Sequence, residues 1–285
     1  MIVTNSISDV MSRIRSIHED AQLFAASEPN DDALIAYLET TDTQFRSIAY
    51  EGAAMSRGLL DISLGDTLLH WTAYMQRTMP HSVQVHIGLG WALAQRQVPL
   101  SSYLQSLSPI MQARVLDGYG YYDGMFRNRT SVRDKVIPEV IKDTDLHAYD
   151  QGVGRSLWYI AKGDLTKLNK LIEGFADSRK ADLWRGIGIA SAYVGGCDES
   201  MLQSIWQEAG AFQIALAAGA VFLAHSRDDA STINEETELT CRTWCKLSAA
   251  EVVALMDQAH PDPATDLDSY IVWVRAIEGR LRNIA

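Results

Sequence analysis

The chain has 285 residues, of which 47% are hydrophobic and 21% are charged, proportions that indicate a soluble globular protein. Its net charge of −11 argues against a nucleic-acid-binding surface, because phosphate contacts need clustered Lys and Arg. The three cysteines are an odd number in a long chain, so no disulfide framework is predicted.

Two segments bear on localisation. Residues 1–28 carry charges along most of their length and lack the apolar core of a signal peptide. The longest apolar run, from Ala211 to Ala224, is broken by Gln213 and is too short to span a bilayer, so it favours a buried helix. We expect a cytoplasmic protein without a transmembrane segment.

Helical periodicity, cap residues and breaks predict helices along the whole chain, with no strand-like alternation of useful length. In the first half, Asp31 or Asp32 is the predicted cap of one helix, and Ser101 with Ser102 caps another. Pro109 marks a helix start, where its missing N–H costs nothing. The predicted helices lie within residues 1–28, 33–38, 47–62, 68–79, 82–96 and 103–107, and from 109 into 118.

Residues 127–135 are polar and are predicted to form a loop. We expect one domain over residues 1–285, with a subdivision near 127–137 as the alternative. In the second half, Pro138 is predicted to open a short helix, and Ser178 is predicted to cap a long one. The glycines at 195 and 196 end that helix, and residues 226–236 form a polar loop. The other predicted helices lie within residues 149–161, 164–175, 181–194, 198–208, 211–225, 237–258 and 266–283.

Glycine motifs recur at a near-constant interval. The first glycines are separated by 36, 30, 34 and 34 residues, and a looser sixth copy follows after 31. A period of this size is typical of helix-pair repeats, and glycines inside a helix predict that another backbone packs against that face. We therefore predict an all-α fold of about six TPR-like helix-pair repeats, either an open array or one curled into a toroid. The copies are Gly52-Ala53-Ala54, Gly88-Leu89-Gly90, Gly118-Tyr119-Gly120, Gly152-Val153-Gly154, Gly186-Ile187-Gly188 and Ala217-Ala218-Gly219.

Polar side chains recur at one position of this repeat. The residue before each first glycine is polar in four of five copies, within otherwise apolar helices. Residues four positions later lie one helical turn away on nearly the same face, so the two sets together predict a pocket. The first set is Glu51, Ile87, Asp117, Gln151 and Arg185; the second set is Met55, Trp91, Tyr121, Arg155 and Ile189.

Candidate functional residues come from these motifs and from the neighbouring stretch of residues 116–133, which is rich in glycine, aspartate, tyrosine and arginine. The candidate catalytic residues are Asp117, Asp123, Glu51, Asp150 and Arg155. The candidate substrate-binding residues are His86, Trp91, Tyr119, Tyr121, Tyr122, Trp158, Trp184 and Arg185.

A purely structural interpretation of the same residues is equally open. Asp117 or Asp150 would then cap a helix, and Asp150–Arg155 or Glu51–Arg185 would be buried ion pairs between repeats. The three tryptophans and His86 would be core residues. No sequence pattern predicts a metal site, a phosphate-binding loop or a nucleophile elbow, and we predict no cofactor.

Five segments resemble one bacterial family, domain-of-unknown-function family 1702, over about residues 45–250. They are YEGAAMSRGLLD, IGLGWALA, DGYGYYDGMFR, YDQGVGRSLWY and SRKADLWRGIGIASAYVGG, in the same order as in the family. The resemblance implies an origin in gene clusters for enediyne polyketides and related specialised metabolites. It also implies tailoring of a polyene or similar apolar chain beside other cluster proteins, but supplies no catalytic residue to carry over.

We expect an enzyme that acts on a long apolar unsaturated chain, a polyene or an isoprenoid, by cofactor-free acid-initiated cyclisation or isomerisation. Asp117 or Asp123 would be the acid and Arg155 would hold the geometry, since a desolvated carboxyl can donate a proton. Aromatic faces would stabilise the cation that forms. One alternative is a non-catalytic helical-repeat scaffold that binds partner proteins in a concave groove. Another, suggested only by the resemblance, is a redox or halogenation partner in an enediyne-type pathway.

Overall fold

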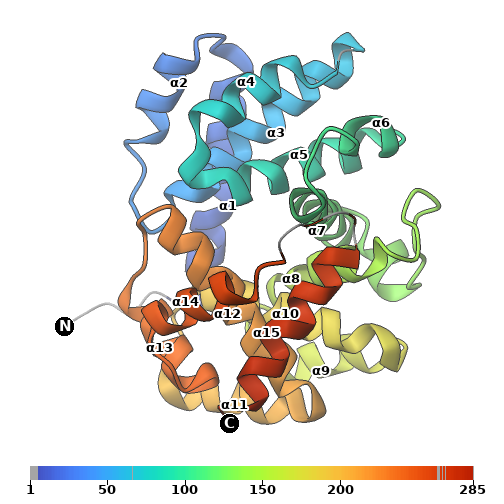
Figure 1. The fold of residues 1–285 in the computed structure, drawn as a ribbon. Coiled ribbons are helices and arrows are strands. Elements are labelled where there is room, and N and C mark those ends of the chain that lie inside the picture. The colour runs from blue at the N-terminus through green and yellow to red at the C-terminus, as the bar shows by residue number, and fades with distance from the viewer. Residues whose placement is uncertain (1–5, 66, 262–263, 265, 267, 285) are drawn as a thin grey trace.

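The structure, a computed structural model, describes residues 6–65, 67–261, 264, 266 and 268–284, and this part of the chain contains helices and no strand (Figure 1). The predicted all-α class is therefore confirmed. Short 3-10 or π turns lie at Met79–His81, Arg129–Arg133, Gly210–Phe212 and Cys241–Cys245. The α-helices are α1 (Ile7–Ser27), α2 (Asp31–Leu38), α3 (Arg46–Leu64), α4 (Leu69–Arg77), α5 (Ser82–Arg96), α6 (Ser101–Leu104), α7 (Pro109–Phe126), α8 (Leu146–Ala161), α9 (Leu165–Glu173), α10 (Asp177–Val194), α11 (Glu199–Ala209), α12 (Gln213–Asp229), α13 (Glu235–Thr240), α14 (Ala249–Ala259) and α15 (Asp268–Arg282).

Several predicted helix caps are wrong. Asn30, not Asp31 or Asp32, caps α2, because its side-chain oxygen accepts hydrogen bonds from two backbone N–H groups of the first turn. The predicted caps of α6 and α10 lie inside the helices they were expected to precede, since α6 begins at Ser101 itself and α10 begins one residue before Ser178. Pro109 does open α7, with Ser108 as its cap.

Three predicted segments also differ. The predicted loop 127–135 contains a π-helical turn, because Ser131 Oγ donates to the carbonyl oxygens of Asp123 and Arg127 and keeps the chain coiled after α7. No helix forms at Pro138, and the chain reaches α8 through turns. The predicted loop 226–236 begins later, since α12 continues to Asp229.

The glycine motifs are the places where successive long helices touch backbone to backbone. A Cβ added to the first glycine of a motif would overlap a carbonyl oxygen of the preceding long helix. That oxygen belongs in each case to the residue before the first glycine of the preceding motif, so these residues take the same place in every contact. The pairs are Gly88 on Glu51, Gly118 on Ile87, Gly152 on Asp117, Gly186 on Gln151 and Gly219 on Arg185.

This packing corrects both ends of the repeat. In the sixth copy, the glycine that packs against a carbonyl oxygen of α10, that of Arg185, is Gly219. The motif therefore starts at Gly219 and not at Ala217. At the other end, a Cβ on Gly52 would overlap the carbonyl oxygen of His18. Helix α1 therefore stands in the place of a copy that precedes the first motif, although it contains no glycine.

The long helices run in the same direction. Near their C-terminal ends, Arg57 of α3 donates to Ala25 O of α1 at 3.0 Å, and Arg127 after α7 donates to Ala94 O of α5 at 2.5 Å. Near its C-terminal end, α12 places Arg227 3.2 Å from Tyr193 O of α10. The short helices α4, α6, α9 and α11 lie between long helices in the chain and carry it back.

Late helices also meet early ones. Gln84, in the first turn of α5, and Ser226, in the last turns of α12, are hydrogen-bonded at 2.9 Å. Gly163, just after α8, faces the side chain of Ile7 at the start of α1. In both contacts the beginning of an early helix lies beside the end of a later one. The finer prediction of TPR-like repeats or a toroid stays a prediction.

One described stretch, Glu199–Asp229, is long and apolar enough to cross a membrane by length and composition. It spans α11 and α12, and 67% of its most apolar window is buried inside the protein. Burial on this scale is typical of a core helix as well.

Candidate functional site

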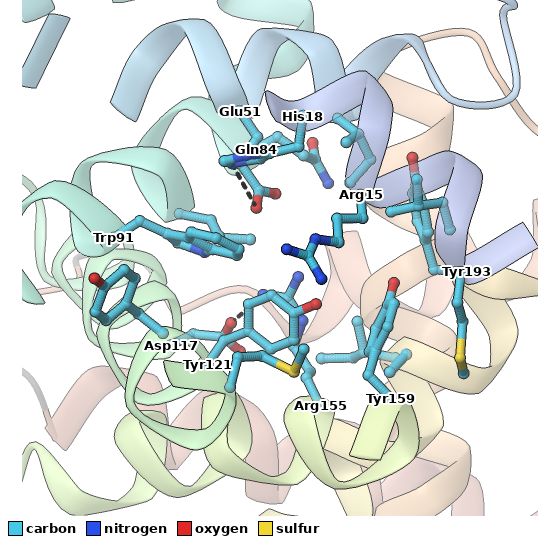
Figure 2. A pocket seen from close by; sticks show the side chains of 18 of the residues that line it. Arg15, His18, Glu51, Gln84, Trp91, Asp117, Tyr121, Arg155, Tyr159 and Tyr193 are labelled. Atoms are coloured by element: carbon cyan, nitrogen blue, oxygen red, sulfur yellow. Dashed lines mark hydrogen bonds and ion pairs between the residues drawn. The ribbon is translucent and has the colours of Figure 1, made fainter. Parts of the chain in front are cut away.

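A cavity of about 470 Å³ lies among the long helices. Side chains of α1, α3, α5, α7, α8, α10 and α12 line it. Figure 2 shows Glu51 and His18 on one side, facing Asp117, Tyr121 and Arg155 across the space. The volume lies within the range of roughly 300–1,000 Å³ typical of small-molecule sites.

The lining follows the repeat. We call the residue before the first glycine of each motif the pre-glycine residue. The five residues that follow it by four positions all line the cavity: Met55, Trp91, Tyr121, Arg155 and Ile189. Of the five pre-glycine residues, Glu51, Ile87 and Asp117 line it, and Gln151 and Arg185 do not. Among the other candidates, Tyr122 lines it too.

Sequence reasoning missed two further parts of the lining. One is α1, which contributes Arg15, His18 and Gln22. These residues are three or four positions apart, like the lining residues of the other long helices, but α1 has no glycine that marks them in the sequence. The other is the next helical turn, which extending the same face by four residues would have found. This turn contributes Gln95, Met125, Tyr159, Tyr193 and Ser226.

Glu51 is a buried carboxyl without an ionic partner of its own. Its side chain is 1% exposed, and its Oε2 atom has no hydrogen-bond partner among the described residues. Burial raises the pKa of Glu51 to about 7, against the opposing effect of the Arg155 charge. A substantial fraction of Glu51 is therefore protonated at neutral pH.

His18 lies beside this carboxyl. Its Nε2 lies 4.0 Å from Glu51 Oε1 and has no hydrogen-bond partner among the described residues. Burial lowers the pKa of His18 to about 4, so the imidazole is neutral at neutral pH. The ring stacks on Trp91 with centroids 4.4 Å apart. Neutral His18 and Glu51, whose protonated form is neutral too, thus form a polar pair beside the Trp91 ring.

Asp117 is fully engaged, in contrast to Glu51. It forms an ion pair with Arg155 and accepts a hydrogen bond from Gln151 Nε2 at 2.6 Å. Gln151 in turn accepts from Tyr270 at 2.6 Å, and the Arg155 guanidinium lies 4.7 Å from the centre of the Tyr121 ring. This network fixes the Asp117 side chain and leaves it poorly placed to give up a proton.

Aromatic rings form another part of the wall. Trp91 lies 5.1 Å from Tyr121, and Tyr121 lies 5.6 Å from Tyr159, measured between ring centroids. Tyr122 and Phe126 extend this surface outwards, and Phe126 is 54% exposed. The ring faces carry partial negative charge and suit an unsaturated or cationic guest.

Seven of the predicted site residues do not line the cavity. Asp123 forms an ion pair with Arg127 and accepts a hydrogen bond from Tyr149 at 3.1 Å. Asp150 forms a buried ion pair with Arg179. The remaining five are His86, bonded to Ser82 O; Arg185, paired with Asp182 and Glu278; and Tyr119, Trp158 and Trp184, in the core.

Buried ion pairs between helices are present, as the structural interpretation expected, but their partners differ from the predicted ones. The predicted pairs Asp150–Arg155 and Glu51–Arg185 do not form, because each arginine meets a carboxylate nearer in the packing. Neither Asp117 nor Asp150 caps a helix, since both lie well inside their helices. Trp158, Trp184 and His86 are buried, as that interpretation predicted.

Replacing Glu51 with Gln is expected to change how stability depends on pH. The pKa of Glu51 is higher in the folded protein than in the unfolded chain, so protonation of Glu51 stabilises the fold. This contribution to the free energy of unfolding is fully present below the pKa of the unfolded state, and it is lost as the pH rises through about 7. Relative to the Gln variant, the wild type should therefore gain about 3 kcal/mol between pH 8 and pH 4.5. Urea unfolding of both proteins across this range measures the difference, and parallel curves would contradict a raised pKa.

No group of three or more His, Cys, Asp or Glu side chains that could hold a metal ion is found in the described part of the chain. The polar side chains that line the cavity carry carboxyl, guanidinium, ammonium, imidazole, amide and hydroxyl groups. Their arrangement can bind, orient and exchange a proton with an apolar guest.

Comparison with known proteins gives one match. The family described as protein of unknown function (DUF1702) matches residues 21–281, nearly the whole chain. Searches of curated proteins and of solved structures return no match.

Proposed function

The chain belongs to the DUF1702 family, and we propose that it is an enzyme that protonates and rearranges an apolar unsaturated molecule in the cavity. The single observation that carries the proposal is Glu51, a buried carboxyl with an unpartnered oxygen beside aromatic rings. The reaction would be a cofactor-free cyclisation or isomerisation. The place of this reaction in specialised metabolism is part of the proposal.

The acid in this proposal is Glu51, in place of Asp117 or Asp123. Asp123 lies outside the cavity lining, and Asp117 is held by Arg155 and Gln151. Glu51 keeps one oxygen free of hydrogen bonds. A carboxyl whose pKa lies near 7 is well matched to proton transfer at neutral pH.

The chemistry balances without a co-reactant. The Glu51 carboxyl would give its proton to one carbon of a double bond, and the other carbon would become a cation. The faces of Trp91 and Tyr121 would stabilise that charge while a new carbon–carbon bond forms or a double bond moves. Loss of a proton from a neighbouring carbon would return the carboxyl to its protonated state.

The size of the cavity limits the substrate. If a methylene group occupies about the volume of a water molecule, ~30 Å³, then 470 Å³ holds roughly fifteen carbon-sized groups. A curled array would suit such a guest, because its inner helix faces converge on one enclosed space. A space lined by seven helices favours this proposal over a scaffold with an open groove.

Deuterium incorporation tests the proposal whatever the identity of the product. The purified protein would be incubated in D₂O with farnesol and with cis-parinaric acid, and extracts would be analysed by mass spectrometry. Protein-dependent deuterium on carbon in any probe, with or without a change of skeleton, is the expected result. Recovery of every probe unlabelled and unchanged would contradict the proposal. Organic extraction of the protein as purified would identify a natural ligand directly.

A further inference from the structure

Arg114 is a buried cation with no ionic partner. It lies on α7, one turn before Asp117, lines the cavity and is 5% exposed. Its guanidinium lies 4.5 Å from the centre of the Phe222 ring and 5.8 Å from that of Trp273. Among the described residues it makes no ion pair within 4.0 Å, and its nitrogens donate no hydrogen bond. These nitrogens are not fully buried, so they are open to a guest in the cavity that Arg114 lines.

The charges around Arg114 do not balance. Arg114, Asp117 and Arg155 are all buried and line one cavity, and they carry two positive charges and one negative charge. Arg155 is the residue that pairs with Asp117. Buried charges are normally paired, because removing a lone charge from water is costly. Arg114 therefore has no carboxylate partner of its own within ion-pair distance in the described part of the chain.

Neutral hydrogen-bonding groups lie on the same side of the cavity. Ser226 is one turn after Phe222 on α12, and it exchanges hydrogen bonds with Gln84 at 2.9 and 3.1 Å. Both side chains line the cavity and are buried. The cavity that Arg114 lines therefore also offers an amide and a hydroxyl group to a guest.

We propose that the cavity binds an apolar chain that ends in a carboxylate, with the carboxylate on Arg114 and the unsaturated part against Trp91 and Tyr121. A planar guanidinium matches a carboxylate through two parallel hydrogen bonds. One guanidinium beside the neutral Phe222 and Trp273 rings suits a singly charged group better than a phosphate, which carries more charge. This inference adds a substrate class, apolar carboxylic acids, to the proposed function. It rests on the proposed function for the apolar chain of the ligand, whereas the carboxylate site is argued from Arg114 alone.

Binding of cis-parinaric acid tests the site, because this conjugated tetraenoic acid fluoresces in an apolar environment. Arg114→Met keeps the length of the side chain and removes its charge. We expect it to weaken binding of the acid by roughly 10- to 100-fold, the effect of losing hydrogen bonds to a charged group. Binding of the methyl ester should change less than about threefold, because the ester has no charge to pair. Arg114→Lys should keep part of the preference for the acid.

Thermal unfolding of the ligand-free protein separates a binding role from a structural one. Arg114→Met should raise Tm or leave it unchanged, since it removes an unpaired buried charge. Arg179→Met is the matched control, because Arg179 is also a buried arginine but is paired with Asp150 outside the cavity. It should lower Tm and leave the acid-over-ester preference intact. A lower Tm for Arg114→Met, or its failure to fold, would show that Arg114 is structural and would overturn the proposal.

The remaining outcomes distinguish this inference from the proposed function. Equal affinity of the wild type for acid and ester would overturn the carboxylate site alone. Failure to bind either probe would contradict the apolar cavity ligand, and with it the proposed function. Glu51→Gln should keep the preference for the acid whether or not Glu51 is the proton donor. Displacement of bound parinarate by tetradecyl phosphate more readily than by myristate would assign the site to phosphate and overturn the carboxylate.

Discussion

Glu51→Gln is expected to lower the rate of product formation by about a hundred- to ten-thousand-fold, the usual contribution of a positioned general acid. Gln has the shape of Glu and suits the same buried position, but its amide does not release a proton. The first atom transferred in the proposed reaction is therefore lost, while the cavity keeps its form. The measurement is deuterium incorporation, or product formation, with whichever probe the wild-type protein converts.

Two other variants serve as controls for this result. Asp123→Asn should leave the rate unchanged in a folded protein, because Asp123 lies outside the cavity lining. Asp117→Asn should weaken the hold on Arg155, and its effect should fall on substrate binding as well as on rate. If Glu51→Gln keeps the wild-type rate and Asp117→Asn abolishes it, the acid is Asp117, one of the two aspartates that the sequence indicates.

Gly152→Ala is expected to lower the free energy of unfolding by more than about 3 kcal/mol, beyond the usual range for overpacking a protein interior. The added Cβ would overlap the carbonyl oxygen of Asp117 and lie 2.7 Å from the amide nitrogen of Tyr121. Both are backbone atoms of α7, so the two helices must separate to admit the methyl group. The effect opposes helix propensity, which favours Ala over Gly by about 1 kcal/mol.

Gly279→Ala is the matched control. Gly279 also lies within a helix, but a Cβ there would meet nothing within 4 Å. Helix propensity then acts alone and should stabilise the protein by about 0.5–1 kcal/mol. Urea unfolding followed by circular dichroism measures both variants. Similar values for the two would mean that the glycine motifs are not the tight contacts described above.

The repeat is readable in the sequence because each contact between long helices requires glycine at one fixed position. Where a helix makes this contact without a glycine of its own, as α1 does through His18, the signal is absent. This is why sequence reasoning misses Arg15 and His18. The looser sixth copy is misplaced by two residues for a similar reason, since alanines surround Gly219.

The candidate site is predictable only on one face of each helix. Trp91, Tyr121 and Arg155 share a face with the pre-glycine residues, and they line the cavity. Asp123 follows Asp117 by six residues, which turns its side chain by about 240° around the helix, so nearness in sequence placed it wrongly. The ion pair Asp150–Arg179 joins side chains from two helices. The helical periodicity of one helix does not reveal which residue of the other helix is the partner.

The bond between Gln84 and Ser226 joins residues that are 142 positions apart. At a synthesis rate of about 5–20 residues per second, roughly ten to thirty seconds pass on the ribosome between the two. During that time each new long helix can stack on its predecessor through local contacts, while the space beside Glu51 still lacks its α12 wall. We expect the carboxyl to remain hydrated and ionised in this nascent chain and to take up its proton only when α12 arrives. The proton affinity of Glu51 would then be a late product of folding, acquired after most of the core is complete.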